Sequence, residues 1–261
     1  MLTLSGHCQT WLQILPEKLL RLKRTKENIK DPLFRFFERE INLGGVLLSD
    51  VRSDLKDILA VCRGELKQNN HLRSLTTSLN KGQVPTSWIR YTTPKTMTSI
   101  EWMNDFSKRM KQFSKLAESK NLRSEEVWLG GVFSPEAYIT ATRQLIAQAN
   151  GWSLEQLHLH VSVEEVSQGS DKFIVKGLRL IGAACKSPNL ISLTDDVHTD
   201  MERVHFSWNK EAKYKRLVSL PVYLYSNRAN LLFCLDFVPT SFDGSLLNER
   251  GVAIVCNSTF S

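Results

Sequence analysis

The spacing of apolar residues changes once along this chain, near residue 156, and this change limits the folds that are open to it. Before this point apolar residues recur every three or four positions, as in segment 100–116, which is the spacing of an amphipathic helix. After it they alternate with polar residues, as in segment 157–163, which is typical of a half-buried strand. The pattern predicts an α+β fold: a helical bundle-like part over residues 1–155, then an antiparallel, incomplete β-barrel of about six strands over residues 156–261.

Local signals predict where several helices begin and end. Thr98 and Glu101 have the spacing of a capping box, and Pro135 stands where proline is favoured at the start of a helix. Pro16 is expected to interrupt the first helical segment, because proline cannot donate the hydrogen bond of a helix interior. The glycine pair at 44–45 predicts either a bend or a close contact between helices.

The second part of the sequence contains short strand candidates that are separated by turn-like segments. Pro221 falls inside one candidate, which indicates an edge strand or a bulge, because proline has no backbone N–H for the sheet. No helix is expected between these strands, so antiparallel pairing is favoured. The candidates are 157–163, 172–181, 190–193, 204–208, 217–225, 231–238 and 251–257.

The positive charge of the protein belongs to its first half. The formal net charge is +7, and 22 of the 34 lysines and arginines lie in residues 1–130. They are densest in a segment that we expect to be a basic helix. Such a helix either binds an acidic partner or is simply a solvated helix face, and the sequence leaves both interpretations open. The residues of this possible partner surface are Lys18, Arg21, Lys23, Arg24 and Lys26, followed by Lys30.

The five cysteines and the absence of long apolar runs bear on the compartment of the protein. The cysteine count is odd and no pair has C-x-x-C spacing, which fits reduced thiols in a cytosolic protein. The first residues lack the features of a secretory signal peptide. No run of about 18 apolar residues occurs, so we expect no membrane span and no membrane partner.

The sequence contains none of the motifs that would indicate catalysis or cofactor binding. The phosphate-binding G-x-x-x-x-G-K-[ST] motif and the G-x-S-x-G nucleophile motif are both missing. His158 and His160 share one face of a predicted strand, but no third metal ligand accompanies them. Aromatic residues concentrate in the slightly acidic second half, away from the basic segment, which argues against nucleic-acid binding. We therefore predict no catalytic residue, no cofactor, no metal and no nucleic-acid partner.

Segment 128–144, WLGGVFSPEAYITATRQ, is similar to a signature near the C-terminus of dynein heavy chains. Segments 28–40, 47–52, 82–88, 221–223 and 250–253 also resemble this family, so the likeness runs in order along the whole sequence. In detail these segments are most similar to the animal cytoplasmic dynein 1 class. We interpret the signature residues as structural rather than catalytic. They are Gly130, Gly131, Phe133, Pro135, Ala137, Thr140, Arg143, Arg250 and Gly251.

The resemblance implies a cytoplasmic, microtubule-associated motor with a ring of AAA+ modules. In that family the C-terminal domain is a helical part plus an incomplete β-barrel that lies against the ring without a catalytic role. The resemblance therefore implies a regulatory or structural domain whose partners are the AAA+ modules of the same heavy chain within the microtubule motor complex. The alternative is a module that binds microtubules or another acidic partner through the basic N-terminal helix. The isolated fragment is expected to be monomeric.

Overall fold

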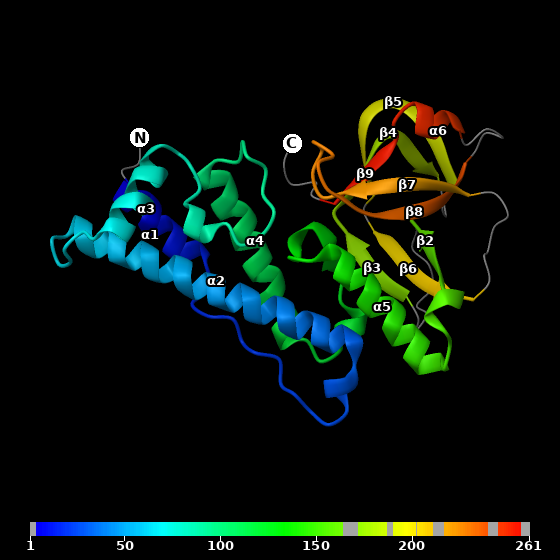
Figure 1. Ribbon diagram of the computed structural model, residues 1–261, viewed down its shortest axis with the longest axis horizontal. Coiled ribbons are helices and arrows are strands. Elements are labelled where there is room, and N and C mark those ends of the chain that lie inside the picture. The colour runs from blue at the N-terminus through cyan, green and yellow to red at the C-terminus, as the bar shows by residue number, and fades with distance from the viewer. Residues whose placement is uncertain are drawn as a thin grey trace. The chain divides into compact units, whose positions relative to one another are not determined.

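The computed structural model describes residues 4–163, 172–186, 190–201, 203–210, 217–239 and 245–256 (Figure 1). Packing divides the protein into two compact units, of which the first holds Met1–Arg24 and Phe37–Ser119 and the second holds Thr25–Phe36 and Lys120–Ser261. Helix α2, Pro32–Cys62, begins in the second unit and continues through the first. The predicted division into a helical subdomain, residues 1–155, and a β-barrel subdomain, residues 156–261, remains a prediction.

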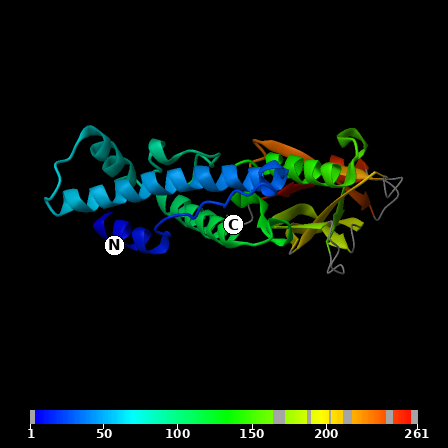
Figure 2. The same ribbon diagram turned by 90° about the horizontal axis from the view of Figure 1, so that it is seen from below.

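The first unit is helical, and its three shorter helices lie beside the long helix α2 (Figures 1 and 2). These are α1, Leu4–Ile14, α3, Asn70–Asn80, and α4, Ser99–Glu118. Their apolar faces form the core of the unit. Fully buried core residues include Val51, Leu55, Ile58, Leu72, Leu75, Met103, Phe106, Met110 and Phe113.

Helix α2 is continuous through its two glycines, and the close helix contact that they suggested is present. A Cβ atom added to Gly44 would lie 2.9 Å from Cδ2 of Phe113, a side chain of α4. The absence of a side chain at this position therefore lets the buried ring of Phe113 approach the backbone of α2. Glycine lowers helix propensity, and tight packing offsets that loss here.

The helix-start signals in the sequence are confirmed at two helices. Thr98 is the N-cap of α4, and its backbone N–H donates to Oε2 of Glu101 at 2.7 Å while the Glu101 N–H donates back to Oγ1 of Thr98 at 3.3 Å. Pro135 stands at the start of α5, Pro135–Asn150, and Gly151 ends that helix with φ +64. Such a left-handed residue at a helix C-terminus favours glycine.

We expect Glu101→Gln to remove the pH dependence that this capping box gives to stability. The hydrogen bonds from Thr98 lower the pKa of Glu101 below its usual value of 4.5. A lowered carboxyl pKa contributes stability that is present above pH 4.5 and is lost as the pH falls through the folded-state pKa. Because Glu101 is exposed, its replacement should cost only a few tenths of a kcal/mol at pH 7.

Urea unfolding at pH 7 and pH 3 checks this expectation, with Glu118→Gln as the control. Glu118 is an exposed carboxylate in the last turn of α4, where the helix dipole disfavours negative charge. Its replacement should be neutral or slightly stabilising at pH 7. The difference in unfolding free energy between the unsubstituted protein and Glu101→Gln should be smaller at pH 3 than at pH 7, and an equal difference at the two pH values would contradict the argument.

A buried ion pair lies on α4, inside a cluster of aromatic rings. Nε of Arg109 donates to Oδ2 of Asp105 at 2.6 Å, and both side chains are at most 1% exposed. The hydroxyl of Tyr91 donates to the same carboxylate at 3.0 Å, and its ring lies 4.3 Å beneath the Arg109 guanidinium. Trp102 stacks on both Trp88 and Tyr91 at the edge of this pair.

The second unit contains a four-stranded sheet covered by helix α5. The strand order is β1–β3–β6–β2, and β1 pairs with β3 in parallel. Trp208 on β6 is mostly buried, and its Nε1 donates to Oγ1 of the buried Thr142 on α5 at 3.1 Å. The strands are β1, Val127–Trp128, β2, His158–Ser162, β3, Lys172–Lys176, and β6, Val204–Asn209.

The other five strands of this unit form a ring in the order β4–β5–β8–β7–β9 (Figure 1). The joint between β5 and β8 is only two residue pairs long, and one partner is Pro239, which has no N–H to donate. The barrel wall is thus weakly closed there, and the predicted fold class, helices followed by an incomplete barrel, is confirmed. The elements are β4, Leu178–Lys186, β5, Leu190–Met201, β7, Val218–Tyr223, β8, Leu231–Pro239, α6, Ser245–Glu249, and β9, Ala253–Val255.

Within this fold class several strands differ in detail from the sequence prediction. The candidate 172–181 is two strands, because Gly177 adopts φ +80 between β3 and β4. The candidate 190–193 continues to Met201. Two joints of the ring, β5 with β8 and β7 with β9, are parallel. Pro221 pairs with Cys234 of β8 beside a register shift between Val222 and Tyr223. The strand pairs with β9 only at Val222 and Tyr223, so the choice between an edge position and a bulge at Pro221 stays open.

Candidate functional site

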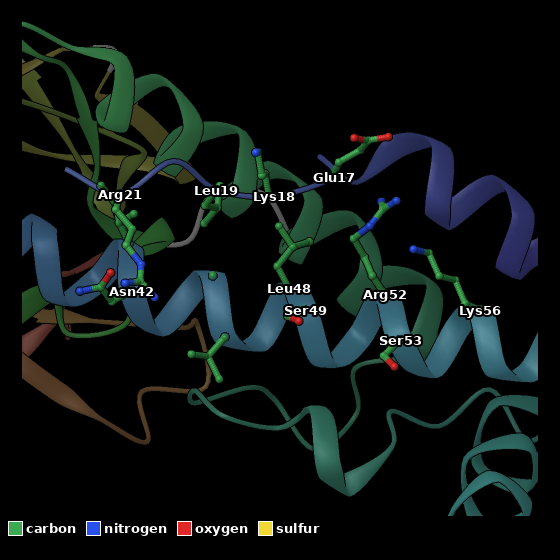
Figure 3. A pocket seen from close by; sticks show the side chains of 13 residues that line it. Glu17, Lys18, Leu19, Arg21, Asn42, Leu48, Ser49, Arg52, Ser53 and Lys56 are labelled. Atoms are coloured by element: carbon green, nitrogen blue, oxygen red, sulfur yellow. The ribbon is translucent and has the colours of Figure 1, made fainter. Parts of the chain in front are cut away.

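The first unit has a groove of about 620 Å³ between the segment that follows α1 and the helix α2 (Figure 3). One wall is the segment from Glu17 to Arg21, and the other is a stripe of α2 residues three or four positions apart. Four basic side chains and one carboxylate, Glu17, line it. The lining residues are Glu17, Lys18, Leu19, Arg21, Ile41, Asn42, Gly45, Val46, Leu48, Ser49, Arg52, Ser53 and Lys56.

Arg52 fixes one end of this groove. Its Nη1 donates to the carbonyl oxygens of Leu12 at 3.0 Å and Leu15 at 3.1 Å, at the C-terminus of α1. These carbonyls have no partner within the helix, and the negative end of the helix dipole favours a cation there. The guanidinium is therefore held in place before any ligand arrives, with donors left over for an anion.

The predicted basic helix is not a helix, which corrects the sequence interpretation. Helix α1 ends at Ile14, residues 16–25 carry no regular secondary structure, and the next element is the single 3-10 turn Asn28–Lys30. Pro16 blocks continuation of α1 and restrains Leu15 to extended geometry. The basic residues further downstream would repel one another on a helix face, so an open conformation is favoured there.

The five predicted basic residues have different environments. Arg24 forms a two-pronged ion pair with Glu38 on α2, with Nε 2.5 Å from Oε1 and Nη2 3.1 Å from Oε2. Lys18 and Arg21 are exposed and line the groove. Lys23 and Lys26 are exposed outside it. The sequence thus identified two residues of the groove but missed Arg52 and Lys56, which only tertiary packing brings to it.

The glycine pair of the signature lies against the indole of Trp128. A Cβ atom on Gly131 would be 2.2 Å from Cε3 of Trp128, and one on Gly130 would be 2.5 Å from the Cys256 carbonyl oxygen. Gly177 approaches the same indole from the end of β3, with 2.4 Å to its Cδ1. Three glycines therefore leave the space that Trp128 and the strand end at Cys256 occupy, which is a structural role in the second unit.

The other residues of the signature sit on or beside α5. Arg143 donates to the Leu154 carbonyl oxygen in the 3-10 turn Leu154–Gln156 and lies 5.5 Å from the ring of Trp208. Thr140 is exposed and donates to the Glu136 carbonyl oxygen within the helix. Phe133 and Ala137 are half-buried.

Arg250 and Gly251 form the end of the short helix α6. The Arg250 N–H donates to the Leu246 carbonyl oxygen at 3.0 Å, and Gly251 has φ +67. The Val252 N–H then returns to the Leu247 carbonyl oxygen at 3.0 Å. Both residues therefore belong to a C-cap that redirects the backbone into β9. Their assignment as signature residues stays a prediction.

Within the described residues, no group of three or more histidines, cysteines, aspartates or glutamates is placed to hold a metal ion. His158 is exposed on β2. All five cysteines are free thiols, and burial raises the pKa of Cys8 to about 12. None of the helices in the described ranges is long and apolar enough to cross a membrane.

Comparisons with known proteins agree with the resemblance seen in the sequence. The protein is 48% identical over 259 residues to a cytoplasmic dynein heavy chain of Caenorhabditis elegans, covering 99% of this sequence and 6% of that protein. It is 43% identical to the Drosophila melanogaster cytoplasmic heavy chain, covering 100% of this sequence and 6% of that protein, and 46% identical to that of Dictyostelium discoideum, covering 87% and 5%. It thus spans about one twentieth of the length of these relatives.

The family described as the C-terminal domain of the dynein heavy chain matches residues 3–256. This match includes the signature at 128–144 and both structural units. The protein therefore belongs to the family of C-terminal domains of dynein heavy chains.

Proposed function

We propose that this chain is a non-catalytic regulatory and structural domain of a dynein microtubule motor. In this proposal it packs against the AAA+ modules of its own heavy chain and modulates force generation and processivity. The relatives are named cytoplasmic dynein heavy chains. In this proposal the parent motor hydrolyses ATP in its AAA+ modules and works on microtubules, as the family resemblance of the sequence implies. The domain itself acts by contact, not by chemistry.

The observation that carries this proposal is a group of exposed apolar side chains on the first unit. Leu43 is 51% exposed and Val46 is 59% exposed on α2, and Leu20 is 49% exposed on the segment that runs over the groove. Leu43 and Val46 are three residues apart, so they share one face of the helix. An apolar face of this kind typically marks a surface that contacts another protein part. With about 95% of the relatives' length lying outside these residues, the rest of the heavy chain is available to cover it.

A domain that modulates a motor must bind the states of the motor cycle with different affinity, since equal binding shifts no equilibrium. It must also be stiff enough to transmit the difference. The buried pair of Asp105 and Arg109 and the packing of Phe113 on Gly44 supply such stiffness within the first unit. The Trp128 contacts do so within the second.

A motor without these 261 residues tests the proposal against the intact motor. We expect the ATPase rate to persist while stall force or run length in single-molecule assays changes. A collapse of the ATPase would mean that the domain only holds the ring together, and unchanged force and run length would contradict regulation.

A point variant of the intact motor makes the same test without a truncation. Leu43→Ser combined with Val46→Ser should shift stall force or run length in the same direction as the truncation, since the apolar contact is weakened. Leu66→Ser is the control, because Leu66 is 41% exposed in the same unit but lies outside this surface. Equal effects of the two variants would count against the proposed contact.

A further inference from the structure

We propose that the groove between segment 17–21 and α2 binds an extended acidic segment of the same heavy chain, in which two acidic positions flank an apolar residue. This inference rests on the proposed function and names the contact that would carry it. The occupant is identified by the chemistry of the groove, which has basic side chains at its two ends and, between them, the apolar side chains of Leu19 and Leu48 together with the exposed Lys18.

The basic side chains are spread along the groove and do not converge on one point (Figure 3). Arg21 lies beside Asn42 at one end, whereas Arg52 and Lys56 lie together at the other, with Leu19 and Leu48 between them. Asn42 and Arg52 are ten residues apart on α2, which corresponds to about 15 Å along the helix axis. A single phosphate cannot contact both ends. An extended peptide covers that distance in about five residues at roughly 3.3 Å per residue.

The charged groups of the groove are available to such a ligand. Within the described part of the protein, Lys18, Arg21 and Lys56 form no ion pair or side-chain hydrogen bond, and all three are exposed. Arg24, by contrast, is already engaged with Glu38. Arg52 is held by the carboxyl end of α1, so it loses little conformational entropy on binding. Only Glu17 opposes an acidic ligand, so the local balance is strongly positive.

The backbone along one wall supports an extended ligand independently of charge. Among the described residues, the segment from Glu17 to Leu22 makes no backbone hydrogen bond to another residue. Its N–H and C=O groups are therefore not engaged by other backbone groups of the described residues. Peptides commonly bind such an open edge by main-chain hydrogen bonds, while side-chain pockets select the sequence.

The rest of the heavy chain is the favoured source of the occupant. Exposed ion pairs contribute only about 0.2–1 kcal/mol each, so a groove with a few of them binds a free peptide weakly. A segment of the same polypeptide is present at an effective concentration in the millimolar range, which is enough to fill a weak site. These residues make up 5–6% of the length of the relatives, which leaves most of such a protein to supply the segment.

A photo-crosslinking residue at position 53 of the full heavy chain tests this inference. Ser53 is exposed on the groove wall, so p-benzoylphenylalanine there reaches the occupant without disturbing the core. We expect an intramolecular cross-link to a segment outside these 261 residues with an acidic–apolar–acidic pattern. Arg21→Glu with Lys56→Glu should reduce the yield about tenfold, which corresponds to about 1.4 kcal/mol. The control, Lys67→Glu with Arg73→Glu, changes the charge equally at exposed sites outside the groove and should leave the yield unchanged.

The inference is overturned by the absence of a cross-link, by a cross-link to a neutral segment, or by a cross-link to tubulin when microtubules are added. The last result would instead support a microtubule-binding module. The groove inference and the proposed function can fail separately. The expected cross-link in the full heavy chain, together with unchanged force and run length in the truncated motor, would support the groove contact and contradict the regulatory role.

Discussion

Asp105→Asn is expected to lower the free energy of unfolding of the protein by about 3–5 kcal/mol, one of the two largest effects that we anticipate. The Asp105 carboxylate is buried and accepts from both Nε of Arg109 at 2.6 Å and the hydroxyl of Tyr91 at 3.0 Å. The asparagine keeps the shape but removes the negative charge. Arg109, 1% exposed, would then lose the carboxylate that it pairs with in the protein interior.

The surroundings of the pair explain why water cannot replace the lost charge. The Arg109 guanidinium lies over the ring of Tyr91, and Trp102 stacks on Phe106 with ring centroids 4.8 Å apart. Trp88 and Trp102 are completely buried. In such a region the attraction between charges is weakly screened, and an unpaired charge is correspondingly costly.

Urea unfolding followed by circular dichroism measures this effect, and Asp50→Asn is its matched control. Asp50 also pairs with an arginine, Arg90, at 3.3 Å, but the two side chains are 47% and 57% exposed. An exposed pair of this kind contributes about 0–1 kcal/mol. Similar losses in the two variants would contradict the assigned role of burial, provided that the denaturant dependence of the unfolding free energy is unchanged.

The sequence could not reveal this ion pair, although it predicted the helix that carries it. Of the apolar residues predicted to share one face of α4, those from Met103 to Leu116 are buried, whereas Ile100 is 50% exposed. Arg109 lies on the buried face, seven positions before Leu116, and Asp105 lies at the border of this face, where charged residues are normally solvated. The Asp105 carboxylate is covered by Tyr91, which lies in the loop before α4, and the spacing of apolar residues within the helix does not predict that contact.

Strands were predicted correctly where the alternation of apolar and polar residues is enough to identify them. They were misjudged where pairing with another strand determines the bounds. Alternation identified β6 and β8 with nearly correct bounds. It could not show that β1, only two residues long, pairs in parallel with β3, because nothing local distinguishes so short a strand. It also joined β3 to β4, since the positive φ of Gly177 becomes evident only once the two strands enter different sheets.

The sequence likewise predicted only part of the groove, because tertiary packing brings its other residues together. The density of lysine and arginine indicated Lys18 and Arg21, but the helix expected there would have placed them on a solvated face. One signal was available in the sequence: Asn42, Ser49 and Lys56 recur every seven residues on the polar face of α2. A polar stripe of this kind does not say what lies opposite, and only the fold places segment 17–21 there.

The second large effect is expected from Gly177→Ala, which should destabilise the protein by about 3 kcal/mol or more. Gly177 has φ +80, and its added Cβ would lie 2.4 Å from Cδ1 of the Trp128 indole. Left-handed geometry alone costs a residue with a Cβ about 1–2 kcal/mol. Overpacking of a filled core adds about 1–3 kcal/mol, because Trp128, only 8% exposed, has little room to move.

Gly151→Ala separates these two contributions. Gly151 also has a positive φ, +64, but no atom lies within 4 Å of the position that its Cβ would take. This variant should therefore lose only the backbone contribution of about 1–2 kcal/mol. A Gly177→Ala variant no less stable than Gly151→Ala would show that the indole adjusts freely, and that the glycines around it have no packing role.

Combining Gly177→Ala with Trp128→Leu tests the steric cause directly. Trp128→Leu alone should be destabilising, because it leaves a cavity between Gly131 and Gly177. In that background, however, the added Cβ no longer meets the indole, and the Cys256 carbonyl oxygen at 3.4 Å is an ordinary contact, so Gly177→Ala should cost no more than Gly151→Ala does. The difference between the two backgrounds is the interaction energy of the cycle, expected to be about 1–3 kcal/mol. An interaction energy near zero would mean that the cost of Gly177→Ala comes entirely from the backbone. The space left for Trp128 would then no longer explain the signature glycines at 130 and 131.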